Sequence, residues 1–345
     1  MNPPIRSPID RIELRREEFE NLRDMFIERL GLSIPPDARS AMERRLQDRL
    51  IHHGHGSFSE YAQFLRFSGA AVDEWEELQD VLTVHETYFW RDDAQLRSVR
   101  DEVLPLLAAQ GQGRRRLTIW SAGCATGEEV YTLAILVHES GLFRDWFVRI
   151  YGSDVSRRCI SVARKGVYGA PSFRAIPQDI RKQYFHERAD GAHVAERIRA
   201  YCSFGQVNLA QPDKIRLVGR QDAIMCRNVL IYFDAGTRRV VTDGFLDRLN
   251  EGGILLLGHS ESLAHVSTAF DLLPLKGDLV YRKPLGSFRS SPEFLKPTCP
   301  TPNHPQRFSL SMTRRSTGGS SQKASRACPT CKWSRVRPTV KRRWT

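Results

Sequence analysis

The segment that most constrains the fold lies at residues 117–141, where a short apolar run ends in small residues and an amphipathic helix follows. The run reads LTIWSAGC, and the helix after the turn reads GEEVYTLAILVHESG. A buried strand that leads through a turn into a helix is the repeating unit of an α/β domain. The segments VRIYGSD and VSRRCISVARKGVY repeat that unit. This alternation predicts a parallel sheet with helices on both faces.

The chain before this segment carries a helical pattern and little strand signal. In the first helix, Phe19, Leu22, Phe26 and Leu30 recur at three- and four-residue spacing, which places them on one face. Three further apolar stripes follow before residue 85. We therefore predict a small helical domain over residues 11–85.

The strand–helix rhythm breaks at residues 170–206. Asp190-Gly191 is a turn signal, and Tyr201, Phe204 and Val207 predict short antiparallel strands inserted into the α/β domain. The alternation then resumes with a strand (DAIMCRNVLIYF), a helix (AGTRRVVTDGFLDRLNEGG), a strand (ILLLGHSES) and a closing hairpin (LLPLKGDLVYRKP). We therefore predict an α/β domain over residues 86–285 with an insertion at about 170–206.

Residues 286–345 differ in composition from the rest of the chain. They hold 13 Lys and Arg residues against one acid, Glu293, and so account for the whole net charge of +12. Their Pro, Ser and Thr content with few clustered apolar residues predicts a disordered basic tail. The rest of the chain carries no net charge, which argues against a specific nucleic-acid binder. The tail itself suits weak contact with polyanions or an anionic membrane.

Neither a signal peptide nor a membrane-spanning run is visible in the sequence, so we expect a cytoplasmic protein. Seven scattered cysteines fit a reducing compartment. Cys328 and Cys331 form a C-x-x-C pair without a second close pair. We favour a cysteine pair without a function over a zinc site at these two positions, and we expect no metal site in the protein.

The turn SAGCATGEE holds the first chemical signal. Gly123 and Gly127 give G-x-x-x-G spacing, which is neither a dinucleotide fingerprint nor a P-loop. Glu128 and Glu129 open the next helix, where they would repel a pyrophosphate and attract a cationic ligand. S-adenosylmethionine, with a sulfonium, an ammonium and no phosphate, is such a ligand. The alternative is that the two acids only complement the helix dipole.

Three further polar positions are candidate ligand contacts. Asp154 lies at the end of the second predicted strand, Asn208 leads out of the insertion, and Asn228 lies within a later apolar run. Asp154 could accept both hydroxyls of a ribose, or could cap the next helix. Asn208 could bond an adenine edge, or could serve as a turn residue. Asn228 follows Arg227 in a run that otherwise predicts a buried strand, with Tyr232 at the far end of that run. Buried polar groups need partners, and ligands bind at the carboxyl ends of parallel strands.

Taken in order, several motifs resemble those of CheR-type chemotaxis receptor methyltransferases. They are TYFWR at residues 87–91, SAGCATGEE, the Asp at the second strand, NL at 208–209, CRNVLIYF and GHSES. The resemblance covers about residues 15–283. It implies a helical domain followed by a Rossmann-like, S-adenosylmethionine-dependent methyltransferase domain with an inserted antiparallel β-subdomain. It also implies methyl transfer from S-adenosylmethionine to glutamates of chemoreceptor cytoplasmic helices.

The resemblance also assigns residues. It implies a cofactor site of His85, Thr87, Arg91, Glu128 or Glu129, Asp154, Asn208, Leu209, Asn228 and Val229, catalytic roles for Arg91 and Tyr232, and a receptor-facing surface of Arg44, Arg45 and Arg49. The sequence leaves open which of Glu128 and Glu129 points inward. His85 stands where many relatives have Asn, Trp90 replaces a usual Phe, and Val130 replaces a usual Pro.

We expect a monomer that acts beside its membrane-embedded receptors, with the tail near the inner membrane face. Two alternatives stay open at this stage: a nucleic-acid methyltransferase, and a non-catalytic S-adenosylmethionine-binding signalling protein. The strand that carries CRNVLIYF lacks the Asn/Asp-Pro-Pro-aromatic motif common in amino-methylating enzymes.

Overall fold

The computed structural model describes residues 12–286 of the chain. The predicted basic tail and its Cys328–Cys331 pair lie outside the described residues, apart from Gly286. The assignments made for them therefore stay predictions.

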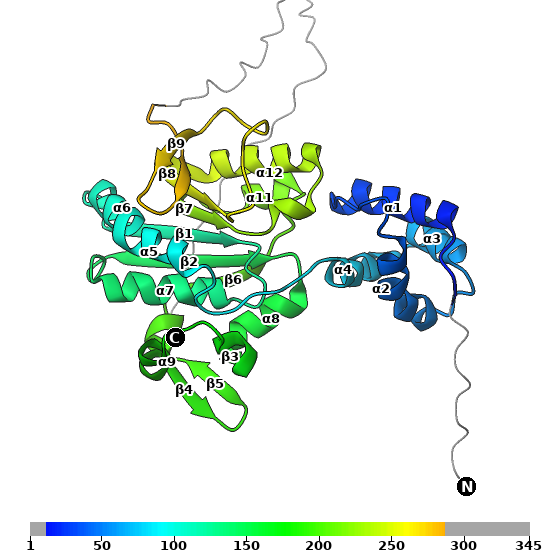
Figure 1. Ribbon diagram of the computed structural model, residues 1–345, viewed down its shortest axis with the longest axis horizontal. Helices are drawn as coiled ribbons and strands as arrows, with labels where there is room; N and C mark the ends of the chain where they lie inside the picture. The colour runs from blue at the N-terminus through cyan, green and yellow to red at the C-terminus, as the bar shows by residue number, and fades with distance from the viewer. Residues whose placement is uncertain (1–11, 287–345) are drawn as a thin grey trace, which may run out of the picture. The chain divides into compact units, whose positions relative to one another are not determined.

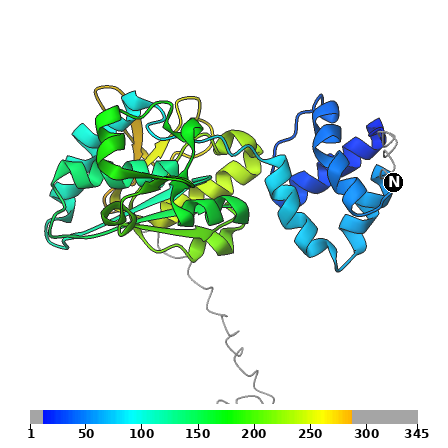
Figure 2. The same cartoon turned by 90° about the horizontal axis from the view of Figure 1, so that it is seen from below.

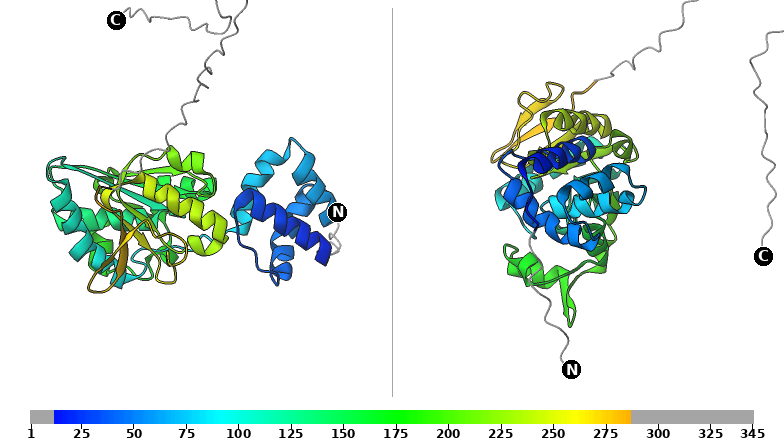
Figure 3. Two further views of the ribbon diagram at one scale, coloured as in Figure 1. Left: turned by 90° about the horizontal axis from the view of Figure 1, so that it is seen from above. Right: turned by 90° about the vertical axis from the view of Figure 1, so that its right-hand side faces the viewer.

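The helical part is a group of four helices that pack together in both views of Figure 3. They are α1 (Arg16–Leu30), α2 (Arg39–His52), α3 (Phe58–Phe67) and α4 (Ala71–Leu82). The predicted apolar stripes form their common core, where Phe19, Leu46 and Leu78 are buried. Gly31 ends α1 in a left-handed conformation, and the Ser57 hydroxyl caps α3.

A seven-stranded sheet forms the centre of the α/β part (Figure 1). In spatial order its strands are β6 (Cys202–Gln206), β2 (Phe147–Asp154), β1 (Arg116–Ala122), β7 (Gln221–Cys226), β8 (Leu249–Leu257), β10 (Leu279–Arg282) and β9 (Asp271–Pro274). The first five are parallel, and β10 and β9 form an antiparallel hairpin at one edge. The predicted closing hairpin is thus confirmed.

Helices cover both faces of the sheet, as Figures 1 and 2 show. One face packs against α6 (Leu104–Gly111), α7 (Glu128–Ser140) and α8 (Arg157–Lys165), and the other against α11 (Pro212–Arg216) and α12 (Ala235–Arg248). Period-two alternation along the strands divides the side chains, so that Ile119 joins the first core and Trp120 the second. The second core continues into the helical domain. The predicted fold class is confirmed.

A small antiparallel sheet is inserted after α8. It consists of β3 (Val167–Tyr168), β5 (Gly191–Val194) and β4 (Phe185–Arg188), flanked by η2 (Ala170–Phe173), α9 (Gln178–Tyr184) and α10 (Glu196–Arg199). The predicted end of the insertion at residue 206 was wrong. Residues 202–206 form β6, which pairs in parallel with β2. As a half-exposed edge strand, β6 lacks the continuous apolar run that marks a central parallel strand.

Two other predictions differ from the structure. The strand predicted over DAIMCRNVLIYF ends at Cys226, and a short 3-10 turn, η3 (Leu230–Tyr232), replaces its second half. The sequence interpretation also passed over α5 (Asp93–Ser98) and the π-helical turn η1 (Val99–Val103), although Leu96, Val99 and Val103 follow helical spacing and are buried. No helix among residues 12–286 is long and apolar enough to cross a lipid bilayer.

The strand order fixes where a ligand can bind. The chain moves outward from β1 through β2 to β6, then returns to the other side of β1 for β7 and β8. Loops after β1 and β7 therefore leave the sheet in opposite directions and open a crevice at their carboxyl ends.

Candidate functional site

A cavity lies at this crevice. Its wall combines the loops that follow β1, β2, β6 and β7 with residues 83–91 and the end of α1. The cavity-lining residues among the predicted cofactor and catalytic positions are His85, Thr87, Arg91, Glu129, Asp154, Asn208, Leu209, Asn228, Val229 and Tyr232. All the predicted cofactor and catalytic residues except Glu128 therefore line the same cavity.

The turn after β1 lies close against its neighbours because it contains glycine. Gly123 has φ +80, and a Cβ there would lie 2.4 Å from Cγ2 of Val229. The backbone N–H groups of Gly123 and Cys124 donate to the Ser153 carbonyl at 2.8 and 2.9 Å. The turn is thus tied to the end of β2, and its backbone forms one wall of the cavity.

Asp154 ends β2 with its side chain only 7% exposed. Its Oδ2 accepts from the backbone N–H of Ala125 at 2.8 Å and its Oδ1 from that of Ser156 at 3.0 Å. Burial raises the pKa of this carboxyl, against those two hydrogen bonds. The residue that caps α8 is Ser156, whose hydroxyl accepts from the Cys159 N–H. The helix-cap alternative for Asp154 is therefore wrong, and each of its oxygens keeps a lone pair for a ligand.

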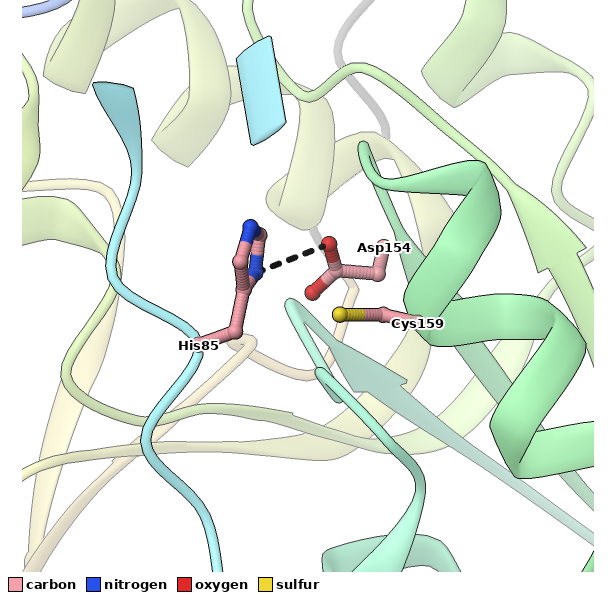
Figure 4. A group of neighbouring side chains, drawn as sticks. All are labelled: His85, Asp154 and Cys159. Atoms are coloured by element: carbon pink, nitrogen blue, oxygen red, sulfur yellow. Dashed lines mark ion pairs between the residues drawn. The ribbon is translucent and has the colours of Figure 1, made fainter. Parts of the chain in front are cut away.

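His85 faces Asp154 across 3.7 Å, from Nδ1 to Oδ1 (Figure 4). The other ring nitrogen, Nε2, lies 2.9 Å from the Thr83 hydroxyl, which itself donates to the Gln79 carbonyl. Since the hydroxyl proton is already used, Nε2 must be the donor to Thr83. Nδ1 is then the ring nitrogen that faces the carboxylate of Asp154.

His85 and Asp154 do not form a direct hydrogen bond at this distance. Ligand atoms of His85, Asp154 and Cys159 lie within 4.8 Å of one another (Figure 4), as a three-ligand metal site would require. Two hydroxyl groups of a bound ribose would satisfy the Asp154 carboxylate without a metal. The Cys159 thiol is buried and its pKa is raised to about 11, chiefly by desolvation, which disfavours the thiolate that a metal needs.

The two acids at the start of α7 point in different directions, which settles the alternative left open by the sequence. Glu129 lines the cavity and accepts from Ser121 Oγ at 2.7 Å and from Arg227 Nη1 at 3.2 Å. Glu128 is 2% exposed and accepts from the hydroxyls of Thr126 and Ser172 at 2.7 and 2.9 Å. Glu128 therefore connects α7 to the inserted subdomain, and burial raises its pKa.

The turn after β7 carries polar groups that the structure leaves without partners. Asn228 has φ +58, and its Oδ1 is buried with no hydrogen-bond partner among the described residues. Glu261, from GHSES, holds this turn by accepting from the N–H groups of Asn228, Val229 and Gly258 at 2.7, 2.9 and 2.9 Å. Because Asn228 is a lining residue of the cavity, a bound ligand is one source of the missing donor.

Arg227 was not among the predicted site residues, although it holds the site together. Its guanidinium donates to Glu129, to the Arg91 carbonyl at 2.9 Å and to Asp92. It thus joins β7, α7 and the segment before α5. A charged residue at the end of an otherwise buried strand was a usable signal for it. Glu261 offered no comparable signal beyond its place in a motif.

Asn208, Arg91 and Tyr232 are half-buried, and Leu209 is buried. Asn208 Oδ1 accepts from the Ala210 N–H at 2.9 Å, as the turn alternative requires, and its amide NH₂ is left to face the cavity. Arg91 donates to the Glu86 carbonyl at 2.8 Å and lies 5.9 Å from the Tyr88 ring centre. The Tyr232 carbonyl accepts from Ser33 N–H at 2.6 Å. Its ring lines the cavity beside the end of α1.

The three arginines predicted to face a receptor separate into two groups. Arg44 and Arg45 are exposed on α2, and Arg45 donates to the Leu82 carbonyl at 2.8 Å. Arg49 instead forms an ion pair with the buried carboxylate of Glu74. None of the three lies at the cavity. The charge of Arg49 is therefore already matched inside the helical domain.

Comparison with known proteins decides the family. The model described as "CheR methyltransferase, SAM binding domain" matches residues 85–277, and "CheR methyltransferase, all-alpha domain" matches residues 17–83. The chain belongs to the CheR methyltransferase family. Its SAM-binding domain makes S-adenosylmethionine the cofactor of a methyltransferase.

Three relatives of this CheR chain illustrate the similarity. "Chemotaxis protein methyltransferase 2" of Vibrio cholerae serotype O1 is 34% identical, over 80% of this chain and 96% of the relative. The protein of the same name from Pseudomonas aeruginosa is 34% identical, over 73% and 89%. "Chemotaxis protein methyltransferase" of Escherichia coli K12 is 28% identical, over 79% and 92%. The CheR similarity spans the helical part and the α/β part together.

Proposed function

We propose that this CheR-family protein transfers the methyl group of S-adenosylmethionine to glutamate side chains on cytoplasmic helices of chemoreceptors. The observation that carries the proposal is the cavity at the ends of β2 and β7, which is lined by the predicted cofactor and catalytic residues except Glu128. Asp154 supplies a carboxylate acceptor there, and the Asn228 oxygen has no partner among the described residues. The cofactor supplies matching donors in its ribose hydroxyls and its ammonium group.

Each wall of the cavity has a distinct task in this proposal. Asp154 accepts the two ribose hydroxyls with His85 beside it, and the Asn208 amide donates to the adenine edge. Glu129 faces the cationic end of the cofactor, with Arg227 holding it in place. The backbone of the Gly123 turn, Thr87, Leu209 and Val229 provide the contact surface.

Methyl transfer to a carboxylate needs little acid–base catalysis by the protein. When bound, the cofactor supplies an electrophilic methyl group on a sulfonium. A glutamate with an ordinary pKa of about 4.3 is already ionised at neutral pH, so no general base is needed. Arg91 and Tyr232 orient the incoming carboxylate, and the surrounding side chains exclude water. The hydrogen bond of Arg91 to Glu86 holds its guanidinium aside, so that it aligns the nucleophile without forming a tight ion pair with it.

The receptor is recognised outside the cavity. We assign this task to the exposed Arg44 and Arg45 on α2, which would attract an acidic receptor helix over long range. The protein acts as a monomer in the cytoplasm. Its basic residues 286–345 add weak contact with the anionic inner membrane face, at about 1 kcal/mol for each basic residue near the surface.

The decisive experiment is transfer of tritium from labelled S-adenosylmethionine to receptor-containing membranes of the same cell. The expected product releases volatile methanol in mild base, because it is a carboxyl methyl ester. Asp154→Ala should reduce the labelling when the cofactor concentration is below saturation. Label in nucleic acid would replace the proposal with a nucleic-acid methyltransferase. Cofactor binding without transfer to either acceptor would leave a signalling protein.

The tail proposal has its own test, which is sedimentation with anionic and neutral liposomes. The full chain is compared with a chain that ends at Leu285. We expect only the full chain to sediment with anionic liposomes, while methylation of a soluble receptor fragment is equal for both chains. Equal sedimentation of both would refute the membrane role.

A further inference from the structure

We propose that a basic groove on the open part of the sheet binds a small ligand that carries two or more phosphate groups. The groove is lined by Arg114, Arg116, Arg149, Tyr151, Lys214 and Arg220, among others. It is distinct from the cofactor cavity, and none of these six residues lines that cavity. The proposal therefore stands independently of the proposed function.

The groove exists because one helix is too short to cover its side of the sheet. The chain between β6 and β7 forms only α11, of five residues. On β2, Phe147 and Arg149 consequently remain exposed, whereas Ile150 on the opposite face is fully buried. Tyr151 is only half-buried and forms part of the floor. Charged and half-exposed side chains of this kind do not belong to a hydrophobic core. We therefore look for a binding role for this open part of the sheet.

Charge around the groove is unbalanced. Asp222 is the acid among its described lining residues, and its carboxylate is fully engaged. Its Oδ1 accepts from Arg114 Nη2 at 3.0 Å and from Asn250 Nδ2 at 2.8 Å, while its Oδ2 accepts from the N–H and hydroxyl of Thr118 at 2.8 and 3.0 Å. Asp222 therefore neutralises Arg114 and has no capacity left for the other cations.

Four cations thus face the groove without a carboxylate partner among residues 12–286. Arg116, Arg149 and Lys214 enter no ion pair there, and Arg220 donates only to main-chain carbonyls, including that of Leu249 at 3.1 Å. Arg116 and Arg149 lie 5.0 and 6.0 Å from the centre of the same Phe147 ring. The ring holds two like charges near each other, and a bound anion would remove their repulsion.

The chemistry of these groups selects phosphate. Guanidinium groups form bidentate hydrogen bonds with phosphate oxygens, and lysine adds a mobile positive charge. Arg116 and Arg149 lie beside one ring, whereas Lys214 belongs to α11 and Arg220 to the turn before β7. Because the cations come from two segments of the chain, we infer a ligand with at least two phosphates, one for each segment.

The test measures how fast phenylglyoxal modifies individual arginines of the full chain, by mass spectrometry. The probe is inorganic tripolyphosphate, with orthophosphate at equal concentration for comparison. We expect tripolyphosphate to slow modification of Arg116 and Arg149 at least about fivefold. The exposed Arg144 and Arg239, which lie outside the groove, should react at an unchanged rate. Because the readout is residue by residue, binding to the basic tail does not mask the result.

The variant R116Q/R149Q should lose one component of tripolyphosphate binding in calorimetry, and the matched control R144Q/R239Q should keep it. If R116Q/R149Q does not fold, the proposal is tested by the protection of Arg116 and Arg149 from phenylglyoxal in the unsubstituted chain. Equal protection at all four arginines, equal protection by orthophosphate, or protection by a short RNA but not by tripolyphosphate would each overturn the proposal.

Discussion

Two clusters of buried polar groups in this molecule differ in whether their hydrogen bonds are complete. In the helical domain, the Glu74 carboxylate is 1% exposed and accepts from Arg49 at 3.0 Å, from His53 at 2.7 Å and from the Tyr61 hydroxyl. At the carboxyl ends of β2 and β7, by contrast, the Asn228 oxygen has no partner within residues 12–286, and His85 lies 3.7 Å from Asp154, too far for a hydrogen bond.

The hydrogen bonds to Glu74 join helices of one domain, whereas the open groups at β2 and β7 belong to residues that line a cavity. A buried charge whose hydrogen bonds all come from the same chain stabilises the fold when intact. A buried acceptor that the fold leaves open costs free energy unless a ligand supplies the donor. The sequence alone did not distinguish the two clusters, because each consists of charged and polar residues between apolar ones.

The largest expected effect is at the closed cluster. Glu74→Ala leaves the Arg49 guanidinium, whose side chain is 19% exposed, without its partner, and should lower the free energy of unfolding by about 3–5 kcal/mol. Chemical denaturation measures the change. Glu77→Ala, at an exposed position of the same helix, is the matched control and should change it by less than about 0.5 kcal/mol.

The pH dependence of this cluster has a definite sign. Burial acts to raise the pKa of Glu74, but the hydrogen bonds from Arg49, Tyr61 and His53 outweigh it and hold the pKa below its ordinary value. The stabilisation is therefore complete above the unfolded-state pKa and is lost as the pH falls through the folded-state pKa. The deficit of Glu74→Ala should shrink in that acidic range. A deficit that stays constant with pH would mean that packing, not charge, dominates there.

At the open cluster the expected effect is on the ligand. Asp154→Ala should weaken binding of S-adenosylhomocysteine by about 1–3 kcal/mol, or roughly 5- to 150-fold, because a charged acceptor is removed. Calorimetry gives the dissociation constant. Since burial raises the pKa of Asp154, affinity of the unmodified protein should begin to fall at a higher pH than for an ordinary aspartate. An unchanged dissociation constant in a folded variant would contradict the ribose role.

Local patterns predicted the fold class and part of the cavity, and the resemblance to the CheR family supplied cavity residues such as Thr87, Arg91 and Leu209. Asp154 and the Gly123 turn follow recognisable strands, and the chain order of an α/β domain places them together. The Glu74 cluster was not predicted, since it depends on which helix faces pack, and Arg49 was assigned to a surface instead. The direction of Glu129 relative to Glu128 depends on the rotation of α7, which adjacent positions in a sequence do not reveal.

A smaller effect is expected at the exposed arginines of the helical domain, which neither cluster engages. Reversing the charge of Arg44 and Arg45 should lower kcat/KM for receptor about tenfold and leave S-adenosylhomocysteine affinity unchanged, because steering acts before binding. The unmodified enzyme should slow as salt is added. Reversal of Arg144 and Arg239, which are equally exposed, serves as the control. A similar loss in both double variants would show a general charge effect rather than a receptor-facing surface.

The smallest expected effect is at Glu128. This buried acid has hydrogen-bond partners, unlike the Asn228 oxygen, but they are hydroxyl groups and not cations as at Glu74. Burial raises its pKa, so its charged form destabilises the fold at neutral pH. A group of this kind contributes its stability below the unfolded-state pKa and loses it as the pH rises through the folded-state pKa. Glu128→Gln keeps the acceptor for Thr126 and Ser172 and removes the charge. It should raise the free energy of unfolding at neutral pH by about 1 kcal/mol or less, with no gain in acid. A loss of stability at neutral pH would show instead that the two hydroxyls satisfy the carboxylate as fully as the arginine satisfies Glu74.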